Sequence, residues 1–221
     1  MKKIVVIAAA ALVVGCTAEP TIQSGPEAET TFDGLVRIDN ARFLGAWVDP
    51  DIDLKRYTKF IPGGAEFEFR AVRNTGRMQS TRSNEREFWI SDANRQRLTE
   101  TVTEIFDEEL QASQHFTMTD EPSLDALIIV GGLHDIVSQV PPDNIGRGDI
   151  WLSSLGEATL IIELRDSLSG ETIFRAIERR AVQPVGGQAV RSNSATNWGE
   201  VRRWARRWAV QLREGLDSVH E

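Results

Sequence analysis

The 221-residue sequence contains a single cysteine, Cys16. A chain with one cysteine cannot form an internal disulfide, so the fold must be held together by its core. Histidine is also scarce: the three residues show no spacing that is typical of a metal site. Beyond the first fifteen residues there is no long apolar run, and we find no internal repeat and no low-complexity tract. These absences argue against a disulfide-stapled module, a zinc domain and a repeat protein.

The sequence also lacks the common catalytic motifs. It contains no Gly-x-Ser-x-Gly, no Walker loop and no Gly-x-Gly-x-x-Gly. An α/β-hydrolase, a P-loop nucleotide hydrolase and a dinucleotide-binding enzyme would each carry one of them. We therefore expect neither a cofactor nor a metal, and we expect the chain not to be an enzyme.

Basic residues are outnumbered by acidic ones. The full chain carries 25 Lys and Arg against 33 Asp and Glu, a net charge of −8. Removal of residues 1–15 would also remove Lys2 and Lys3, which leaves 23 basic and 33 acidic side chains and a net charge of −10. Nucleic-acid binding needs a positive footprint, so this balance argues against it.

The N-terminus has the order of segments that is typical of a secretory signal peptide. Lys2 and Lys3 supply a positive start, residues 4–14 form an apolar run, and Gly15 is the small residue before Cys16. A helix needs about 20 apolar residues to span a bilayer, so this run is too short for that. The alternative is a buried N-terminal element with an ordinary core cysteine.

Val13-Val14-Gly15-Cys16 resembles a bacterial lipobox. The resemblance implies that the Cys16 thiol carries diacylglycerol, that cleavage occurs between Gly15 and Cys16, and that the new amine is acylated. Several acyl chains would anchor the chain stably to a membrane. The residue after the cysteine is Thr17 and not aspartate. By the enterobacterial sorting rule this favours the periplasmic face of the outer membrane over the inner membrane.

The sequence predicts three segments. Residues 1–15 are expected to be the lipoprotein signal peptide. Residues 16–33 would be the lipidated cysteine and a disordered tether, because residues 17–34 are rich in Pro, Gly and small polar side chains. Residues 34–221 would form one periplasmic domain, a size sufficient for a single core.

Residues 56–139 are expected to form strands around one helix. Residues 56–62 and 65–72 would be strands joined by a Gly63-Gly64 turn. Ser91 is a suitable N-cap for a helix that runs to about Ser113. A short strand around Phe116 and Met118 and a longer strand would follow. The longer strand covers residues 125–139, with a bulge at Gly131-Gly132.

The last third of the chain predicts a hairpin and a second helix. Residues 157–182 alternate apolar and polar side chains around a turn at 166–170, which is typical of an antiparallel hairpin. Asn197 would cap the last helix, with Glu200 completing a capping box. The resulting fold class is α+β: one domain with a mixed, mostly antiparallel sheet and two long helices packed on it.

Three stretches resemble a known family. They are DLKRYTKFIP (53–62) and, between residues 124 and 182, LDALIIVGGLHDIV and EATLIIELRDSLSGETIFRAIERRAV. Together with the lipobox they resemble a domain-of-unknown-function family of bacterial lipoproteins, the one numbered thirty-three thirteen. A more distant likeness, through residues 166–171, is to envelope assembly lipoproteins: the curli secretion lipoprotein, PelC and LpoB. The first resemblance implies location and fold, and the second implies a scaffold or partner-binding role.

A few polar residues could carry chemistry, and each has a simpler interpretation. His134 and Asp135 are adjacent in an expected strand, so they should point to opposite faces and not form a catalytic pair. The acidic run at 49–53 begins like a calcium loop but lacks the required glycine and glutamate, which favours an acidic turn. Glu109 falls on the apolar stripe of the first helix, as either a buried functional carboxylate or a residue near the helix end that reaches water.

The last helix is the best candidate for a docking face. Its apolar arc, from Val201 through Trp204 and Trp208 to Val219, should lie on the sheet. Arg202, Arg206 and Arg213 line up on one flank. They are either a solvated surface that balances nearby carboxylates or a contact for an acidic partner.

Three functions remain in competition. The first is a non-catalytic envelope lipoprotein that docks a protein partner as an assembly factor, activator or scaffold. The second is a binder of a small ligand or lipid, because six tryptophans and nine phenylalanines could line a pocket. The third is an enzyme that acts on envelope material. A flat face favours the first, a large apolar cavity the second, and a cleft with clustered titratable groups the third. The oligomeric state is left open.

Overall fold

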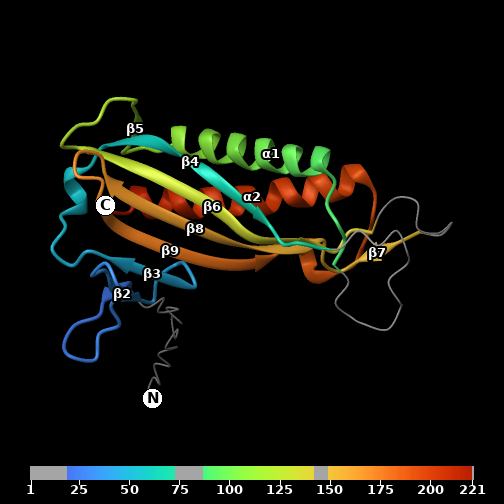
Figure 1. The fold of residues 1–221 in the computed structure, drawn as a ribbon, viewed down its shortest axis with the longest axis horizontal. Helices are drawn as coiled ribbons and strands as arrows, with labels where there is room; N and C mark the ends of the chain where they lie inside the picture. Colours follow the sequence, from blue (N-terminus) through green and yellow to red (C-terminus); the bar gives the residue numbers. More distant parts are fainter. Residues whose placement is uncertain (1–18, 73–86, 142–148, 221) are drawn as a thin grey trace, which may run out of the picture.

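A computed structural model describes residues 19–72, 87–141 and 149–220. The lipobox, the Arg-rich stretch at 73–86 and most of the loop after Pro141 lie outside the described residues. Within them, one large sheet carries two long helices (Figure 1). The structure confirms the α+β class, with a mixed, mostly antiparallel sheet.

The large sheet has eight strands in the order β1-β2-β3-β9-β8-β6-β4-β5. Their bounds are β1 Thr21–Ile22, β2 Val36–Asp39, β3 Gly45–Val48, β4 Lys59–Phe69, β5 Thr117–Met118, β6 Ala126–Ser138, β8 Gly156–Asp166 and β9 Thr172–Ala181. The pairs β4–β6 and β4–β5 are parallel, and the other pairs are antiparallel. A separate two-stranded sheet pairs β7 (Trp151–Leu152) with β10 (Val190–Arg191). Short 3-10 turns lie at Leu54–Arg56 and Val185–Gly187.

The expected turn at Gly63-Gly64 does not exist. Residues 59–69 form one strand, β4, which runs parallel to β6 with a register shift between Pro62 and Ala65. The two glycines therefore form a bulge, and Gly64 has a φ of 90° that only glycine adopts readily. The bulge expected at Gly131-Gly132 is also wrong, because β6 bulges between His134 and Val137 instead.

Helix α1 spans Asp92–Gln111 and begins where the sequence predicts. The Ser91 side chain accepts a hydrogen bond from the Asn94 N–H and so caps the helix. Helix α2 spans Ser194–Asp217, and here the expected cap is wrong. Asn193, not Asn197, accepts from the N–H of the third helical residue, Thr196, at 2.9 Å. The helix starts earlier because residues 194–196 are compatible with its first turn.

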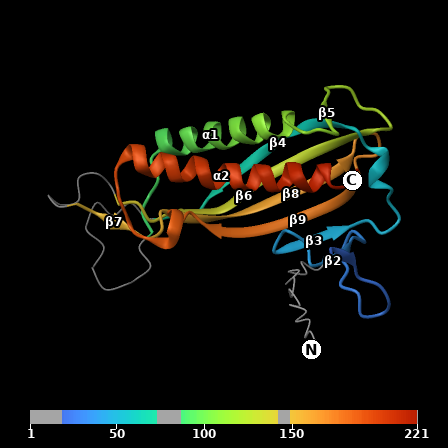
Figure 2. The ribbon, with the colours of Figure 1, turned by 180° about the vertical axis from the view of Figure 1, so that it is seen from behind.

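Both helices lie side by side on one face of the large sheet (Figures 1 and 2). The core forms between them and the strands, and α2 contributes its predicted arc. Trp208 is fully buried there, and Trp204 is nearly so. The Trp204 indole also donates to the Arg180 carbonyl at 3.3 Å. Neither described helix is long and apolar enough to cross a membrane.

The segment at 19–33 differs from the disordered tether that its composition predicts. Thr21 and Ile22 pair with β2, and the Gln23 N–H donates to the Arg37 carbonyl at 2.9 Å. Backbone and side-chain hydrogen bonds to the sheet edge therefore supply the order that apolar burial does not.

Candidate functional site

The face of the sheet opposite the helices is not covered by any described helix (Figures 1 and 2). Alternate residues of each strand lie on it, because successive side chains of a strand point to opposite faces. Its apolar members are half-buried and come from five strands: Trp47, Ile61, Ile128, Val130, Ile161 and Ile177. We call this surface the open face.

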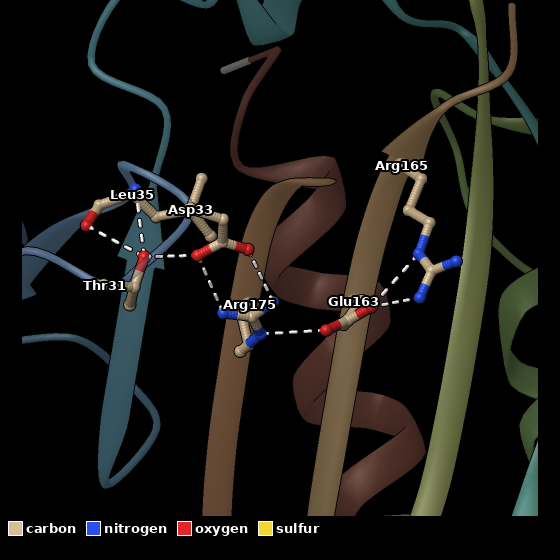
Figure 3. A network of polar contacts seen from close by, with 6 residues as sticks. All are labelled: Thr31, Asp33, Leu35, Glu163, Arg165 and Arg175. Atoms are coloured by element: carbon tan, nitrogen blue, oxygen red, sulfur yellow. Dashed lines mark hydrogen bonds and ion pairs between the residues drawn. The ribbon is translucent and has the colours of Figure 1, made fainter. Parts of the chain in front are cut away.

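An ordered chain of ion pairs crosses one part of the open face (Figure 3). Arg175 on β9 donates from Nε to Glu163 Oε1 on β8 at 2.8 Å. Arg165 donates to the other oxygen of Glu163 at 2.6 Å. On its far side Arg175 donates to both oxygens of Asp33, at 3.2 and 2.8 Å. The Asp33 carboxylate also accepts from the Thr31 hydroxyl at 2.6 Å, so the network ties the N-terminal segment to the sheet.

The network holds its carboxylates ionised. Burial alone would raise the pKa of Glu163, but hydrogen bonds from Arg165 and Arg175 lower it below the usual value. The hydrogen bond from Arg175 likewise lowers the pKa of Asp33 against the opposing effect of burial. A carboxylate held this firmly as an anion is a poor general acid near neutral pH.

A hollow of about 480 Å³ lies in the open face beside this network. Its polar lining side chains are Glu66, His134, Glu163 and Arg165. His134 Nδ1 lies 3.0 Å from Glu68 Oε2. No serine, threonine, cysteine, tyrosine or lysine lines the hollow, so the described residues supply no nucleophile for the imidazole to activate. The arrangement is suited to binding.

An exposed aromatic side chain stands next to the ion pairs. Phe32 is 96% exposed, the most exposed of the large apolar residues in the described chain. Its ring centroid lies 5.6 Å from the guanidinium carbon of Arg175. Aromatic residues, including Phe, and arginine are enriched in protein interfaces relative to the rest of the surface.

The predicted site residues are distributed over three places. Gly15 and Cys16 lie outside the described residues. Arg206 of α2 lies 2.9 Å from Glu108 and 3.4 Å from Glu109 of α1, and Arg213 lies 3.6 Å from Glu109. These distances match the interpretation in which the arginines balance neighbouring carboxylates.

Arg202 is exposed, and no described carboxylate lies within ion-pair distance of it. Whether the three arginines also contact a partner stays a prediction.

The other polar candidates have structural roles. The Asp53 carboxylate in the acidic run accepts from the Lys55 N–H and caps a short turn. Asp135 occupies the β6 bulge with a φ of 54°, which breaks the alternation predicted for it and His134. Its side chain accepts from Arg70 and lies 3.7 Å from Arg179. Among the described residues no group of three potential metal ligands occurs.

Sequence reasoning missed Phe32, Asp33 and Arg175. The first two fall in the segment expected to be a tether, and Arg175 is an ordinary position of a hairpin strand. Asp33 and Arg175 are 142 residues apart, so no local pattern links them. One available signal was Phe32, a large apolar residue in an otherwise polar segment.

Comparisons with known proteins give only distant similarities. No protein-family model and no curated protein sequence matches the chain. Solved structures that it resembles include a dodecamer of a PelC variant from Paraburkholderia phytofirmans, with 13% identity, a TM-score of 0.40 and coverage of 77% of this chain and 97% of that one. A Xanthomonas campestris protein of the DUF330 family has 10% identity and a TM-score of 0.42, with coverage of 78% and 90%.

A homologue of a neuraminyllactose-binding hemagglutinin from Helicobacter pylori has 8% identity, a TM-score of 0.39 and coverage of 75% and 88%. Similarities at this level identify neither a family nor a function. The lipoprotein family expected from the sequence therefore stays a prediction.

Proposed function

We propose that this chain is a lipid-anchored protein of the bacterial cell envelope that has no catalytic role and docks a protein partner. Anchoring is proposed from the lysines, apolar run and lipobox at residues 2–16. Placement on the periplasmic face of the outer membrane follows from Thr17 after the cysteine. The partner would be another envelope protein that assembles with, or is activated by, this one.

The observation that carries the docking role is the open face. Both helices cover one side of the sheet, while the other side presents half-buried isoleucines, an ordered ion-pair network and Phe32. This mixture of an apolar centre and charged groups held in fixed positions is typical of protein interfaces. The partner surface should therefore be apolar at its centre, with a pocket for the Phe32 ring.

Anchoring is tested by replacing Cys16 with serine. We expect the variant to leave the membrane fraction as an uncleaved or released form, because serine cannot accept the diacylglycerol thioether. Fractionation of Cys16→Ser with the outer membrane, as for the wild type, would contradict the anchor.

Docking is tested with a photo-reactive amino acid at Phe32 in cells. We expect it to cross-link one discrete envelope protein, and we expect Ile161→Glu to abolish the adduct by placing a charge in the apolar centre. The control is the same photo-reactive residue at Arg207, which is exposed on α2 on the opposite side of the sheet. Equal adducts from both positions would show that capture reflects proximity alone and would reject the open face.

A further inference from the structure

The core has a gap beneath α1. A cavity of about 110 Å³ lies between this helix and strands β4, β6 and β8. Its walls are almost entirely apolar and include Val102 and Phe106 of α1, Phe67 of β4 and Ile162 of β8. It lies on the helix side of the sheet, so it is distinct from the hollow in the open face.

The gap exists because Gly131 occupies a core position. Along β6 the side chains of Leu127, Ile129 and Leu133 point into the core, and Gly131 falls between the last two in this alternation. A Cβ atom at residue 131 would meet no atom within 4 Å, and its φ is not positive, so neither space nor backbone geometry requires glycine. Glycine inside a strand weakens the strand and often marks a bulge or a close approach by a ligand or another backbone. The bulge here is in β4, beside Gly131, and leaves space on the helix side of β6.

The cavity reaches the surface beside an edge strand. Pro62, Gly64 and Ala65 of β4 line it and are exposed, as are Thr103 and Asp107 of α1. On its outer side β4 pairs only at Lys59 and Phe60, with β5. Among the described residues nothing pairs with the outer edge of 63–69. Such an edge is a template for one more strand.

The mouth of the cavity is acidic. Asp107 lies in its wall, and Glu104 is exposed one turn earlier on α1. No described cation lies within ion-pair distance of these two carboxylates, whereas Glu108 is paired with Arg206. No lysine or arginine lines the cavity. A ligand that approaches here should be cationic outside its apolar part.

The volume limits the apolar part to a single side chain. A dry cavity of about 150 Å³ holds one benzene molecule, and drug-sized ligands need about 300 Å³ or more. A cavity of 110 Å³ therefore accepts one aliphatic side chain and is too small for the length of a fatty acyl chain.

From these features we propose that β4 and α1 form a strand-addition site for an extended, basic segment of a partner protein. The segment would add as a strand along residues 63–69, place one valine- or leucine-sized side chain in the cavity left by Gly131, and direct a lysine or arginine to Asp107. Backbone hydrogen bonds would supply affinity, and the cavity and carboxylate would supply specificity. The inference extends the docking role proposed above, but it uses a different surface.

The test uses defined peptides and the full chain in detergent. The probe is a fluorescent seven-residue peptide, Lys-Thr-Val-Thr-Lys-Thr-Val, which places Lys and Val on the same face of a strand. This Lys/Val peptide is titrated against the protein beside a Glu/Val peptide, with Glu for Lys, and a Lys/Ser peptide, with Ser for Val. We expect the Lys/Val peptide to bind at least tenfold more tightly than either of the others. We also expect its binding to slow hydrogen exchange of amides in residues 63–69. Absence of binding, or protection elsewhere than in β4, would overturn the proposal.

Substitutions in the chain separate the two recognition elements. Gly131→Val should fill the cavity and leave the melting temperature equal or higher. It should also lower the affinity for the Lys/Val peptide at least tenfold. Gly199→Val is the control, because a Cβ at residue 199 of α2 also meets no atom within 4 Å. Asp107→Lys tests the charge without changing the core, and it should lower the affinity for the same peptide about tenfold.

Unchanged affinity in both Gly131→Val and Asp107→Lys would reject the site. A fatty acid is tested in the same way. If the fatty acid binds, Gly131→Val blocks its binding, and no peptide binds, then the cavity holds a lipid, and the strand-addition site is also rejected. Cross-linking at Phe32 reports on the open face and is independent of each of these results.

Discussion

The hydroxyl of Tyr57 donates a hydrogen bond of 2.8 Å to Asp166 Oδ2 and so joins the residue two positions before β4 to the turn between β8 and β9. Arg56 contributes a second contact to the same oxygen at 2.7 Å. Asp166 Oδ1 accepts the backbone N–H groups of Leu168 and Ser169 at 3.0 and 2.9 Å. Tyr57 is fully buried, so one anionic carboxylate organises this end of the sheet.

We predict that Asp166 makes the folded state sensitive to acid. Burial alone would raise its pKa, but hydrogen bonds from Ser169, Tyr57 and Leu168 and the charge of Arg56 lower it to about 2. An unfolded aspartate has a pKa of about 3.9. The stabilisation is therefore fully present above about pH 4 and is lost as the pH falls toward 2. Urea unfolding of Asp166→Asn should show a shallower decline of stability over this interval than the wild type.

The same measurements on Tyr57→Phe isolate the hydrogen bond. Its loss should lower the free energy of unfolding at pH 7 by about 1–2 kcal/mol, because a buried bond to a charged acceptor is removed. Identical pH profiles for the wild type and Asp166→Asn would contradict the assigned role.

A second prediction concerns the N-terminal segment. Asp33 and Arg175 fasten residues 31–35 to β9, so deletion of residues 19–33 should lower the melting temperature by several degrees. Asp33→Asn alone should lower the free energy of unfolding by about 1 kcal/mol through loss of the charged hydrogen bonds. Glu27→Gln serves as the control, because Glu27 is exposed and makes no ion pair with a described residue. A deletion variant that melts with the intact chain would restore the tether interpretation.

Local sequence signals were sufficient to predict the elements whose contacts lie within one short stretch of the chain. Ser91 caps α1 through an N–H three residues away, and the hairpin of β8 and β9 is joined by a turn within one short stretch. Strand β4 was divided wrongly because its partner, β6, lies more than sixty residues along the chain. Two adjacent glycines form a turn or a bulge depending on that distant partner, which the sequence pattern does not reveal.

The contacts of the candidate site also depend on residues that are distant in the sequence, so they could not be predicted from local patterns. The alignment of Arg206 and Arg213 follows from helical periodicity, but their ion pairs depend on how α1 packs against α2. The contact between Asp33 and Arg175 joins an apparently disordered segment to a hairpin strand, and composition alone favoured disorder for the first. The gap at Gly131 is visible only once α1 is placed over it.

The packing of α1 against α2 also changes the expected result of reversing the arginines. Glu109 is 14% exposed in its side chain and faces both Arg206 and Arg213. Reversal of Arg202, Arg206 and Arg213 to Glu would place like charges against Glu108 and Glu109. We predict a loss of about 1–3 kcal/mol in the free energy of unfolding, because a largely buried carboxylate would lose its partners. Arg202→Glu alone should change stability by less than about 0.5 kcal/mol.

A compensated variant separates this structural role from contact with an acidic partner. Arg206→Glu combined with Glu108→Arg and Glu109→Gln restores the ion pair with residue 108 in the opposite sense and removes the negative charge that residue 206 faces at residue 109. Thermal melting of this variant should return most of the way to the wild-type value, whereas Arg206→Glu alone should melt lower. Capture of the proposed envelope partner is then compared at equal stability. If the arginines only join the two helices, the compensated variant captures the partner as the wild type does. Loss of capture in that folded variant, together with loss in Arg202→Glu, would instead show that the positive flank of α2 contacts the partner directly.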